Sequence, residues 1–455
     1  MDILKDFKSL DKFSILYKWS RSIFDIFLRI FYRKFIVHGL ENLPKNKAYI
    51  IASNHQNALM DPLVVMKSLE RPVFISRADL FKTKNLLSRF FVFCRIIPSF
   101  RIRDGKETLK FNHDMFLRVS QILQNNVPLV IFPEAQHFDK RHLLPLKKGI
   151  TRMAFTTEVN CDFKLDLQII PAGIYYSNYF NFQADVKIIL GKPINVQKYK
   201  QLFLENEARA NAELRDEIAN ELKKCIIHIE DLNNYTAYEM LRVVNRTKML
   251  KDLRLENKGV NDLFADQATI KLIEEAHKKN TEKTQELFDT ATQYAENLKK
   301  YALRNWLFEK GKFNQFALIG HFFAFFILFP LFLYGFLNNL LALQPQRILN
   351  KKFKDPQFHS SVRFVFFTFA TPFIHLAQFG LIALITDSWW IKWVYLISLL
   401  PSGYFAYYYY TFWTKFKAKQ RFESLKKTNK EVFNNLQTMR TALIDKISEI
   451  SIKSA

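Results

Sequence analysis

The sequence contains few of the residues that interrupt regular structure or cross-link a chain. Of its 455 residues, 11 are glycine, 14 are proline and three are cysteine. The cysteines, Cys94, Cys161 and Cys225, are far apart, show no metal-ligand spacing and leave one thiol over after any pairing. This pattern argues against a disulfide framework and favours a reducing compartment.

Acidic residues are scarce relative to basic ones: 43 Asp and Glu stand against 67 Lys and Arg, a formal net charge of +24. This balance favours an anionic partner, which could be a nucleic acid, a membrane surface or a phosphorylated substrate. The chain shows no recognised nucleic-acid motif, and many basic residues flank apolar stretches. We therefore predict contact with membrane lipid and no nucleic-acid partner.

The N-terminal region lacks the clean apolar core and small-residue cleavage site of a signal peptide. Between residues 13 and 33, polar residues recur every three or four positions, and aromatic and aliphatic residues fill the rest. This spacing predicts a basic amphipathic helix that is charged too often to span a bilayer comfortably. We predict that residues 1–33 form a helix in the membrane interface; the alternative is a helix packed on the protein's own core.

Residues 34–196 alternate short apolar runs with helical patterns, which predicts an α/β layer fold. The runs that have the length and composition of buried strands are 49–51, 73–75, 129–132 and 168–170. Residues 197–312 are rich in charge, and their spacing predicts a charged helical region with a break near Gly259.

Residues 313–414 form a predicted membrane region with three apolar stretches. These are 316–343, 364–385 and 389–413. The last two are long enough to cross hydrocarbon, which needs about 20 residues. Basic residues lie before the second stretch and after the third, and the turn between them has none, which predicts a hairpin with both ends cytoplasmic.

The first apolar stretch, 316–343, has basic residues on both flanks, and Pro330 and Asn338-Asn339 interrupt it. We interpret it as a re-entrant or interfacial hairpin; a simple crossing is the competing interpretation. Residues 415–455 are predicted to form a basic cytoplasmic helical tail. Together these patterns predict an integral membrane protein with its α/β domain on the cytoplasmic face.

The stretch "NHQNALMD", followed by Pro62, places an imidazole and a carboxylate a short, fixed distance apart. Asp61 before Pro62 predicts a helix start with Asp as the N-cap. The carboxylate can then accept a hydrogen bond from one nitrogen of His55, which leaves the other nitrogen to take a proton from a hydroxyl group. A structural histidine near a helix cap is the alternative.

Three further segments place polar or special residues in loops after buried strands. Arg101 and Arg103 follow "IIPSF", Glu134 ends "LVIFPE", and Pro171 ends "QIIP". In α/β sheets, ligands bind beyond the carboxyl ends of the strands. Each feature alone has a structural explanation, but their common placement predicts one site.

The order His-Asp, Arg, Phe-Pro-Glu, apolar-Pro resembles the four sequence blocks of the glycerolipid acyltransferases, which acylate glycerol 3-phosphate or its monoacyl form. The lead-in "GLENLPKNKAYIIASNHQNALMDP" is similar to the start of that family's domain. The resemblance covers about residues 34–196 and implies a central mixed sheet flanked by helices. It also implies His55 as general base and Asp61 as the group that orients it.

The same resemblance implies that Arg101, assisted by Arg103, binds the substrate phosphate and that Glu134 organises the pocket. It implies that the region around Pro171 helps to form the acyl-chain side. Five residues separate His from Asp here, whereas four are usual; a subgroup that accepts glycerol 3-phosphate or dihydroxyacetone phosphate shares this spacing, with Asn at the place of Asn57. Asn57 is therefore among the predicted substrate-binding residues. Ala135 replaces the family's glycine after Phe-Pro-Glu.

These roles predict direct acyl transfer from an acyl-CoA or acyl-carrier-protein co-substrate to a phosphorylated glycerol acceptor, without an acyl-enzyme and without a further cofactor. His113, His137 and His142 show no convincing ligand spacing, so no metal is predicted. Two alternatives stay open: acylation of another head group, such as an amino-acid lipid, and a non-catalytic lipid-binding scaffold.

Overall fold

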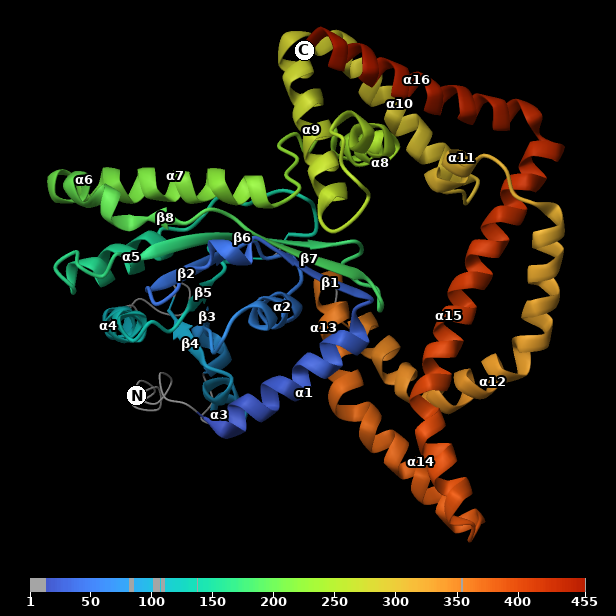
Figure 1. Cartoon of the computed structure of the whole chain (residues 1–455), viewed down its shortest axis with the longest axis horizontal. Helices are drawn as coiled ribbons and strands as arrows, with labels where there is room; N and C mark the ends of the chain where they lie inside the picture. The colour runs from blue at the N-terminus through green and yellow to red at the C-terminus, as the bar shows by residue number, and fades with distance from the viewer. Residues whose placement is uncertain are drawn as a thin grey trace. The chain divides into compact units, whose positions relative to one another are not determined.

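The computed structural model describes residues 14–81, 86–100, 107, 111–136, 138–352 and 355–454. The chain divides into two compact units. The first comprises residues 1–228 together with 355–364, and the second comprises residues 229–354 and 365–455. Figure 1 shows the elements of both units, which are described separately below.

The first unit is built on a mixed eight-stranded sheet, which confirms the predicted fold class. Its strand order is β1-β7-β6-β2-β5-β3-β4, with β8 also paired to β6. The pairs of β6 with β7 and β8 are antiparallel, and the other pairs are parallel. The strands are β1 Lys34–His38, β2 Tyr49–Ser53, β3 Val73–Arg77, β4 Ile96–Ser99, β5 Leu129–Ile131, β6 Gln168–Tyr176, β7 Asp185–Leu190 and β8 Ile194–Asn195.

Helices cover both sides of this sheet; Figure 1 shows α7 on one side and α1 and α2 on the other. Side chains of α4, α5 and α7 join the strands in a core that includes Ile50, Leu129 and Leu214. The helices of this unit are α1 Ile15–Phe31, η2 Leu40–Asn42, α2 Met60–Ser68, η3 Ala78–Phe81, α3 Leu86–Phe93, α4 Phe111–Gln124, α5 Gly149–Val159, η6 Val196–Tyr199, α6 Lys200–Glu205, α7 Glu207–Cys225, η7 Pro356–Phe358 and α13 His359–Val365.

The domain extends beyond the boundary expected at residue 196, because α7 packs directly on β6. A Cβ atom added at Gly173 of β6 would lie 2.0 Å from the carbonyl oxygen of Cys225, so only glycine allows this approach. Leu214, Ile218 and Leu222 of α7 are fully buried. The first part of the charged helical region is therefore a layer of the α/β domain, and the compact unit ends at residue 228.

Pro171 does not end its strand, contrary to the sequence-based expectation. It lies inside β6, where it pairs in register with Ala52 of β2. Its carbonyl oxygen accepts a hydrogen bond from Gly191 N at 2.8 Å, on the side of β6 away from β2. On that same side, β6 pairs with β8 before Pro171 and with β7 after it. Pro171 lies between these two pairings, so its missing N–H removes no hydrogen bond of either one.

Helix α1 begins at Ile15, inside the range 1–33 predicted as a helix, of which residues 1–13 lie outside the described residues; the Ser14 side chain caps it by accepting a hydrogen bond from Tyr17 N at 3.2 Å. Its two ends differ in environment. Leu28 and Phe31 are buried in the domain, whereas Leu16 and Trp19 are each 68% exposed. Packing on the protein's own core therefore describes its C-terminal end, and the amphipathic surface expected of an interfacial helix lies toward its N-terminal end.

The second unit contains a group of amphipathic helices that the terminal helix completes. Helix α16 packs against α8, α9 and α10, burying Leu436, Leu443 and Ile447. The predicted tail is thus partly an integral element of this unit. Gly259, with φ +59°, lies in the loop between α8 and α9, as predicted. The helices are α8 Tyr235–Asp252, α9 Asn261–Lys279, α10 Thr281–Lys300, α11 Asn305–Lys310 and α16 Lys430–Ser454.

The apolar part of this unit consists of α12 Gln315–Lys352, the π-helical turn η8 Phe366–Ala370, α14 Thr371–Ile385 and α15 Trp389–Thr428. The prediction of a hairpin within 316–343 is wrong, because α12 runs through this stretch without a break. Asn338 and Asn339 do not interrupt it: their side-chain amides donate to carbonyl oxygens one turn earlier, at 2.8 and 2.9 Å.

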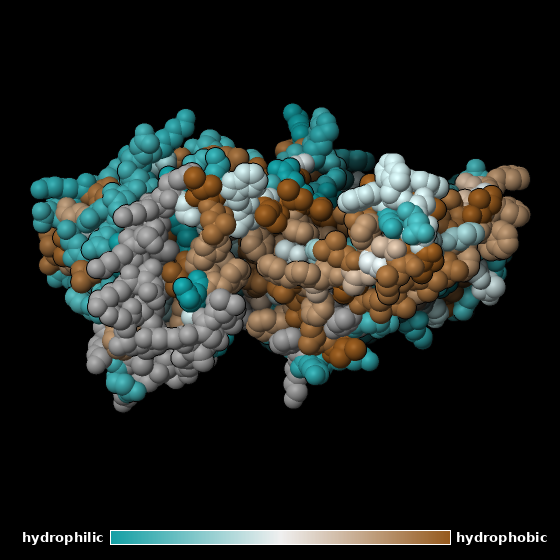
Figure 2. Space-filling model, turned by 90° about the horizontal axis from the view of Figure 1, so that it is seen from below, coloured by the Kyte–Doolittle hydropathy of each residue, from teal (hydrophilic) through white to brown (hydrophobic). Residues whose placement is uncertain are grey.

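Two helices in the described part of the chain have the length and apolar composition to cross a membrane, 315–344 and 356–385. Only 6% and 17% of their most apolar stretches are buried, unlike a core helix of a soluble protein. Figure 2 shows hydrophobic residues, in brown, over much of the visible surface of this apolar part. The expected span 389–413 lies in α15, which is not one of the two; this segment is rich in Tyr and Trp.

Candidate active site

The loop between β2 and α2 carries the predicted imidazole and carboxylate. His55 lies two residues after β2, and Asp61 lies in the first turn of α2. The prediction that Asp61 caps this helix is wrong, since α2 begins at Met60 and its N-cap is Leu59. Pro62 still lies in the first turn, where its missing N–H costs nothing, while the Asp61 carboxylate turns back toward the loop.

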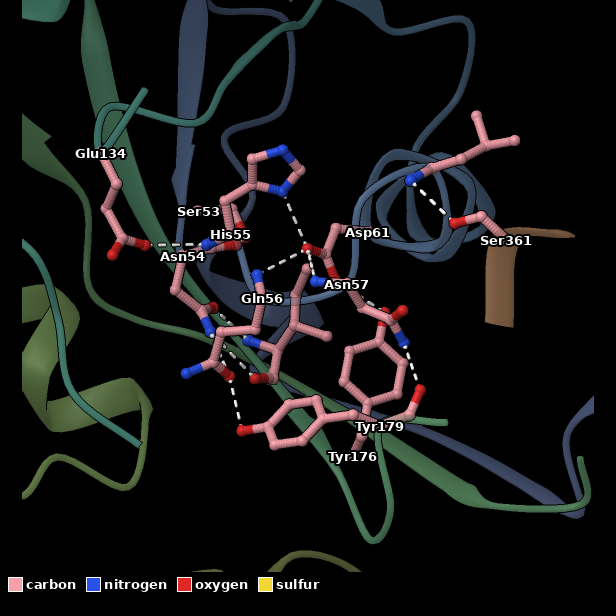
Figure 3. Close-up of polar contacts among 12 residues, drawn as sticks. Ser53, Asn54, His55, Gln56, Asn57, Asp61, Glu134, Tyr176, Tyr179 and Ser361 are labelled. Atoms are coloured by element: carbon pink, nitrogen blue, oxygen red, sulfur yellow. Dashed lines mark hydrogen bonds and ion pairs between the residues drawn. The ribbon is translucent and has the colours of Figure 1, made fainter. Parts of the chain in front are cut away.

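The Asp61 carboxylate is fully buried and accepts four hydrogen bonds (Figure 3). Its Oδ2 atom lies 2.8 Å from His55 Nδ1, 2.8 Å from Gln56 N and 2.7 Å from Asn57 N. Its Oδ1 atom accepts from the Tyr176 hydroxyl at 2.8 Å. A carboxylate that accepts several hydrogen bonds is stabilised in its charged form, which is the form that orients an imidazole.

The His55 ring is fixed on two sides. Its Nδ1 atom faces Asp61, and its face stacks on Phe132 with 4.5 Å between ring centroids. Because Nδ1 faces a carboxylate, it carries the proton, and Nε2, on the opposite side of the ring in Figure 3, has the lone pair. The side chain is 15% exposed, so the ring is partly accessible to a substrate. This arrangement can accept a proton from a bound hydroxyl group.

Glu134, which follows β5, joins the His55 loop to the next loop of the site. Its Oε1 atom accepts from His55 N and its Oε2 atom from Leu144 N, both at 2.8 Å. The side chain is 1% exposed, and this burial raises its pKa to about 7, against the opposing effect of the two backbone N–H groups. Glu134 thus holds two backbone segments together, and its role in organising a substrate pocket stays a prediction.

The remaining predicted residues fall into different environments. Arg101 and Arg103 lie outside the described residues. Asn57 is fully buried, and its side-chain amide donates to Tyr179 O at 2.9 Å, so its observed contacts are within the protein. Pro171 lies in the interior of β6. Contact of Asn57 or Pro171 with substrate stays a prediction.

Ala135 preserves the turn after Glu134 although it is not glycine. Its φ of +59° lies in the left-handed region, at a cost of roughly 1–2 kcal/mol for a residue with a Cβ atom. Its N–H closes the turn by donating to Phe132 O at 3.2 Å. In the described part of the chain, no three or more His, Cys, Asp or Glu side chains gather closely enough to hold a metal ion.

Sequence reasoning missed the residues that hold the loop from β6 and from the segment after it. Besides Tyr176, Tyr179 donates its hydroxyl to Gln56 Oε1 at 2.9 Å. Asn54 pairs with the backbone of Ile174, donating to its O at 3.1 Å and accepting from its N at 2.7 Å. The sequence signal that could have found Tyr176 is the Tyr175-Tyr176 pair at the end of an apolar strand, since buried tyrosine hydroxyls usually find a polar partner.

A His–Asp pair at the carboxyl edge of a mixed sheet, with a buried glutamate beside it, is the arrangement that the resemblance to the glycerolipid acyltransferases implies. Residues 34–175 match the family model described as Acyltransferase, so this part of the chain is similar to that family. The match begins at residue 34, where the predicted domain begins, and ends at residue 175, within the predicted range 34–196.

Two curated relatives show how far the similarity reaches. Glycerol-3-phosphate O-acyltransferase 1 of Saccharomyces cerevisiae is 27% identical over 206 residues, which cover 44% of this chain and 26% of that protein. The 1-acyl-sn-glycerol-3-phosphate acyltransferase of Borreliella burgdorferi is 26% identical over 197 residues, covering 42% and 72%. The chain thus matches about a quarter of the length of the yeast relative.

Among solved structures, the crystal structure of the 1-acyl-sn-glycerophosphate acyltransferase from Thermotoga maritima is 21% identical, with a TM-score of 0.33. The match covers 46% of this chain and 77% of that one.

Proposed function

We propose that this protein is a membrane-bound O-acyltransferase of glycerolipid synthesis. It moves an acyl chain from a thioester, acyl-CoA or acyl-carrier protein, to a hydroxyl group of glycerol 3-phosphate or of its monoacyl form. The similarity to the acyltransferase family and the relatives named for these two acceptors support the proposal. The observation that carries it is the 2.8 Å contact between His55 Nδ1 and the buried Asp61 carboxylate.

In the proposed mechanism, His55 Nε2 takes the proton from the acceptor hydroxyl as its oxygen attacks the thioester carbonyl carbon. A C–O bond forms, and the carbonyl electrons move onto oxygen to give a tetrahedral intermediate. The intermediate collapses with cleavage of the C–S bond, and the thiolate takes the proton from the imidazolium. Asp61 stabilises the imidazolium between these steps. No side chain becomes acylated.

The acceptor phosphate requires cations, and Arg101 with Arg103 is proposed for this role from the resemblance. Arginine suits it because its guanidinium can bind phosphate through two parallel hydrogen bonds. The membrane location is supported by the two apolar helices at 315–344 and 356–385 and by the exposed apolar side chains of α1. The cytoplasmic position of the domain is proposed from the distribution of basic residues.

Glycerol 3-phosphate, or dihydroxyacetone phosphate, is the preferred acceptor in this proposal, because the His-to-Asp spacing of five residues is that of the subgroup with these acceptors. The second candidate is lysophosphatidate, which the Borreliella relative's name supports.

The test is a panel of glycerol 3-phosphate, dihydroxyacetone phosphate and lysophosphatidate with the full chain in detergent–lipid micelles, using His55→Ala as control. Acylation of one phosphate acceptor, lost in His55→Ala, is expected. Turnover confined to an amino-acid head group would favour that alternative acceptor. No turnover with any acceptor and donor, or equal turnover in His55→Ala, would overturn the proposal.

A further inference from the structure

The segment 355–364 is far from the active-site loop in sequence but belongs to the same compact unit. It contains η7 and α13. The chain continues from α13 through η8 into α14, and residues 356–385 form one of the two candidate membrane helices. The start of a candidate membrane helix is therefore built into the acyltransferase domain.

Two serines of α13 bind the His55–Asp61 loop directly. The Ser360 hydroxyl donates to Asn57 Oδ1, a bond that joins residues 303 positions apart. The Ser361 Oγ atom accepts from Leu59 N at 3.2 Å, as Figure 3 shows. Ser360 is 1% exposed and Asn57 is fully buried, so the bond between them is shielded from water, whereas Leu59 is 41% exposed. The Ser360 bond is costly to break, because the Asn57 side chain would be left buried without its partner.

Contacts on both sides hold α13 in this place. Arg363 donates to Phe180 O at 2.5 Å, in the turn that follows β6. Phe364 is 1% exposed and packs edge-on against Phe31 at the end of α1, with 5.4 Å between ring centroids. The serines are thus presented by a segment that is itself fixed to the domain.

The loop contains a residue in an unfavourable conformation. Ala58, one of the five residues between His55 and Asp61, has φ +38°, which is unfavourable for a residue with a Cβ atom. Asn57, next to it, donates its backbone N–H to Asp61 Oδ2 and receives the Ser360 hydroxyl on its side chain. Only one residue therefore separates Ser360 from the carboxylate that orients His55.

We propose that Ser360 and Ser361 are positioning residues of the acyl-transfer site. They hold the extended His–Asp loop in its reactive shape and link that shape to the helix that continues into the apolar region. This inference rests on the proposed function. It assigns this role to α13, which lies outside residues 34–175, the part of the chain that the family model matches.

The experiment compares the full chain with Ser360→Ala, Ser360→Thr and Ser361→Ala. Displacement of a catalytic group by about 1 Å can cost about 100-fold in rate. We expect Ser360→Ala to lower kcat by roughly 10- to 100-fold while the acceptor KM changes less than about threefold, since the loop orients the base. Ser360→Thr, which keeps the hydroxyl, should recover most of kcat. Ser361→Ala should lower kcat in the same sense.

A matched control is Ser120→Ala in α4. Ser120 is 2% exposed and its hydroxyl is hydrogen-bonded to Phe116 O and Thr157, but it lies outside the loop network. It should retain kcat. The thermal unfolding midpoint of each variant separates misfolding from misalignment, and kcat is compared only among variants that keep the wild-type midpoint.

A second measurement uses the Asp61→Asn background, in which the negative charge that the loop holds against the imidazole is already absent. There, Ser360→Ala should reduce kcat little further, whereas independent effects would multiply. Wild-type kcat in both folded serine→Ala variants, or multiplied losses in the double variant, would overturn the inference while leaving the acyltransferase proposal intact. If the wild-type chain acylates no acceptor, the proposed function itself fails.

Discussion

Replacement of Asp61 by asparagine tests the central contact of the site with little change in shape. Asn can place its carbonyl oxygen at the Oδ2 position and still accept from Gln56 N, Asn57 N and His55 Nδ1. Its amide would then face the Tyr176 hydroxyl, which can accept instead of donate. The substitution therefore preserves the loop and removes the negative charge beside the imidazole.

The size of the effect follows from what the charge does. General base catalysis by a positioned side chain contributes roughly 10²- to 10⁴-fold, and this depends on a base that is correctly oriented and stabilised as imidazolium. We expect kcat to fall about 10³-fold, which corresponds to about 4 kcal/mol of transition-state stabilisation. Tyr176→Phe is the matched control: it removes one donor to Asp61 Oδ1 but leaves the charge, and should cost about tenfold or less.

The assay is acyl transfer to the preferred acceptor under saturating donor, with kcat and KM measured for wild type, Asp61→Asn and Tyr176→Phe. The thermal unfolding midpoint of Asp61→Asn should stay within a few degrees of wild type. A folded Asp61→Asn protein with kcat within tenfold of wild type would show that the carboxylate is structural, and the base assignment of His55 would lose its support.

Three further predictions concern stability and topology. The pKa of Glu134 in the folded protein, about 7, lies above its unfolded value near 4.5, so this residue stabilises the fold most below pH 4.5 and loses that contribution as the pH rises to 7. The resulting fall in the unfolding free energy is on the order of 3 kcal/mol and should disappear in Glu134→Gln. Unfolding measured at both ends of this pH range checks the prediction. Gly173→Ala should destabilise the first unit by about 3 kcal/mol, because the new Cβ atom meets the Cys225 carbonyl oxygen at 2.0 Å, whereas Gly149→Ala, which meets only Met153 Cε at 3.8 Å, should be nearly neutral in the same thermal melt. A cysteine at Asp387, between α14 and α15, should react with a membrane-impermeant thiol reagent in intact cells if the predicted hairpin is correct; protection of this cysteine until the membrane is opened would contradict it.

The sequence alone was sufficient for the His55–Asp61 pair because the two residues are close along the chain. Glu134 could be associated with them because β2 and β5 end at the same edge, and the structure places these strands side by side as parallel neighbours. Tyr176 could not be assigned, because its contact depends on β6 lying next to β2 in a particular register. The α13 serines are further removed, since no local pattern reports a contact across 303 residues.

The errors have a common physical origin in local rules that tertiary contacts override. Asp61 before Pro62 has the pattern of a helix cap, but the carboxylate gains more from His55 and two loop N–H groups than from its own helix. Pro330 and the two asparagines have the pattern of a break, but α12 continues through them. Asn338 accepts from the Tyr395 hydroxyl at 2.7 Å, and Asn339 donates to Leu399 O at 3.1 Å, both in α15. In both cases the side chain found a partner that composition does not reveal.

Because Asp61 is buried, the loop conformation that satisfies its carboxylate is also the one that orients His55 for the proposed reaction. A buried carboxylate left without donors costs several kcal/mol, and three of the four groups that stabilise it here come from residues 55–57 of the same loop. Movement of the loop away from Asp61 would therefore expose this cost, which confines the loop to the conformation that also orients His55. Substitutions that loosen the loop from outside, at α13 or at Tyr179, should accordingly lower the rate of acyl transfer at temperatures where the domain as a whole remains folded.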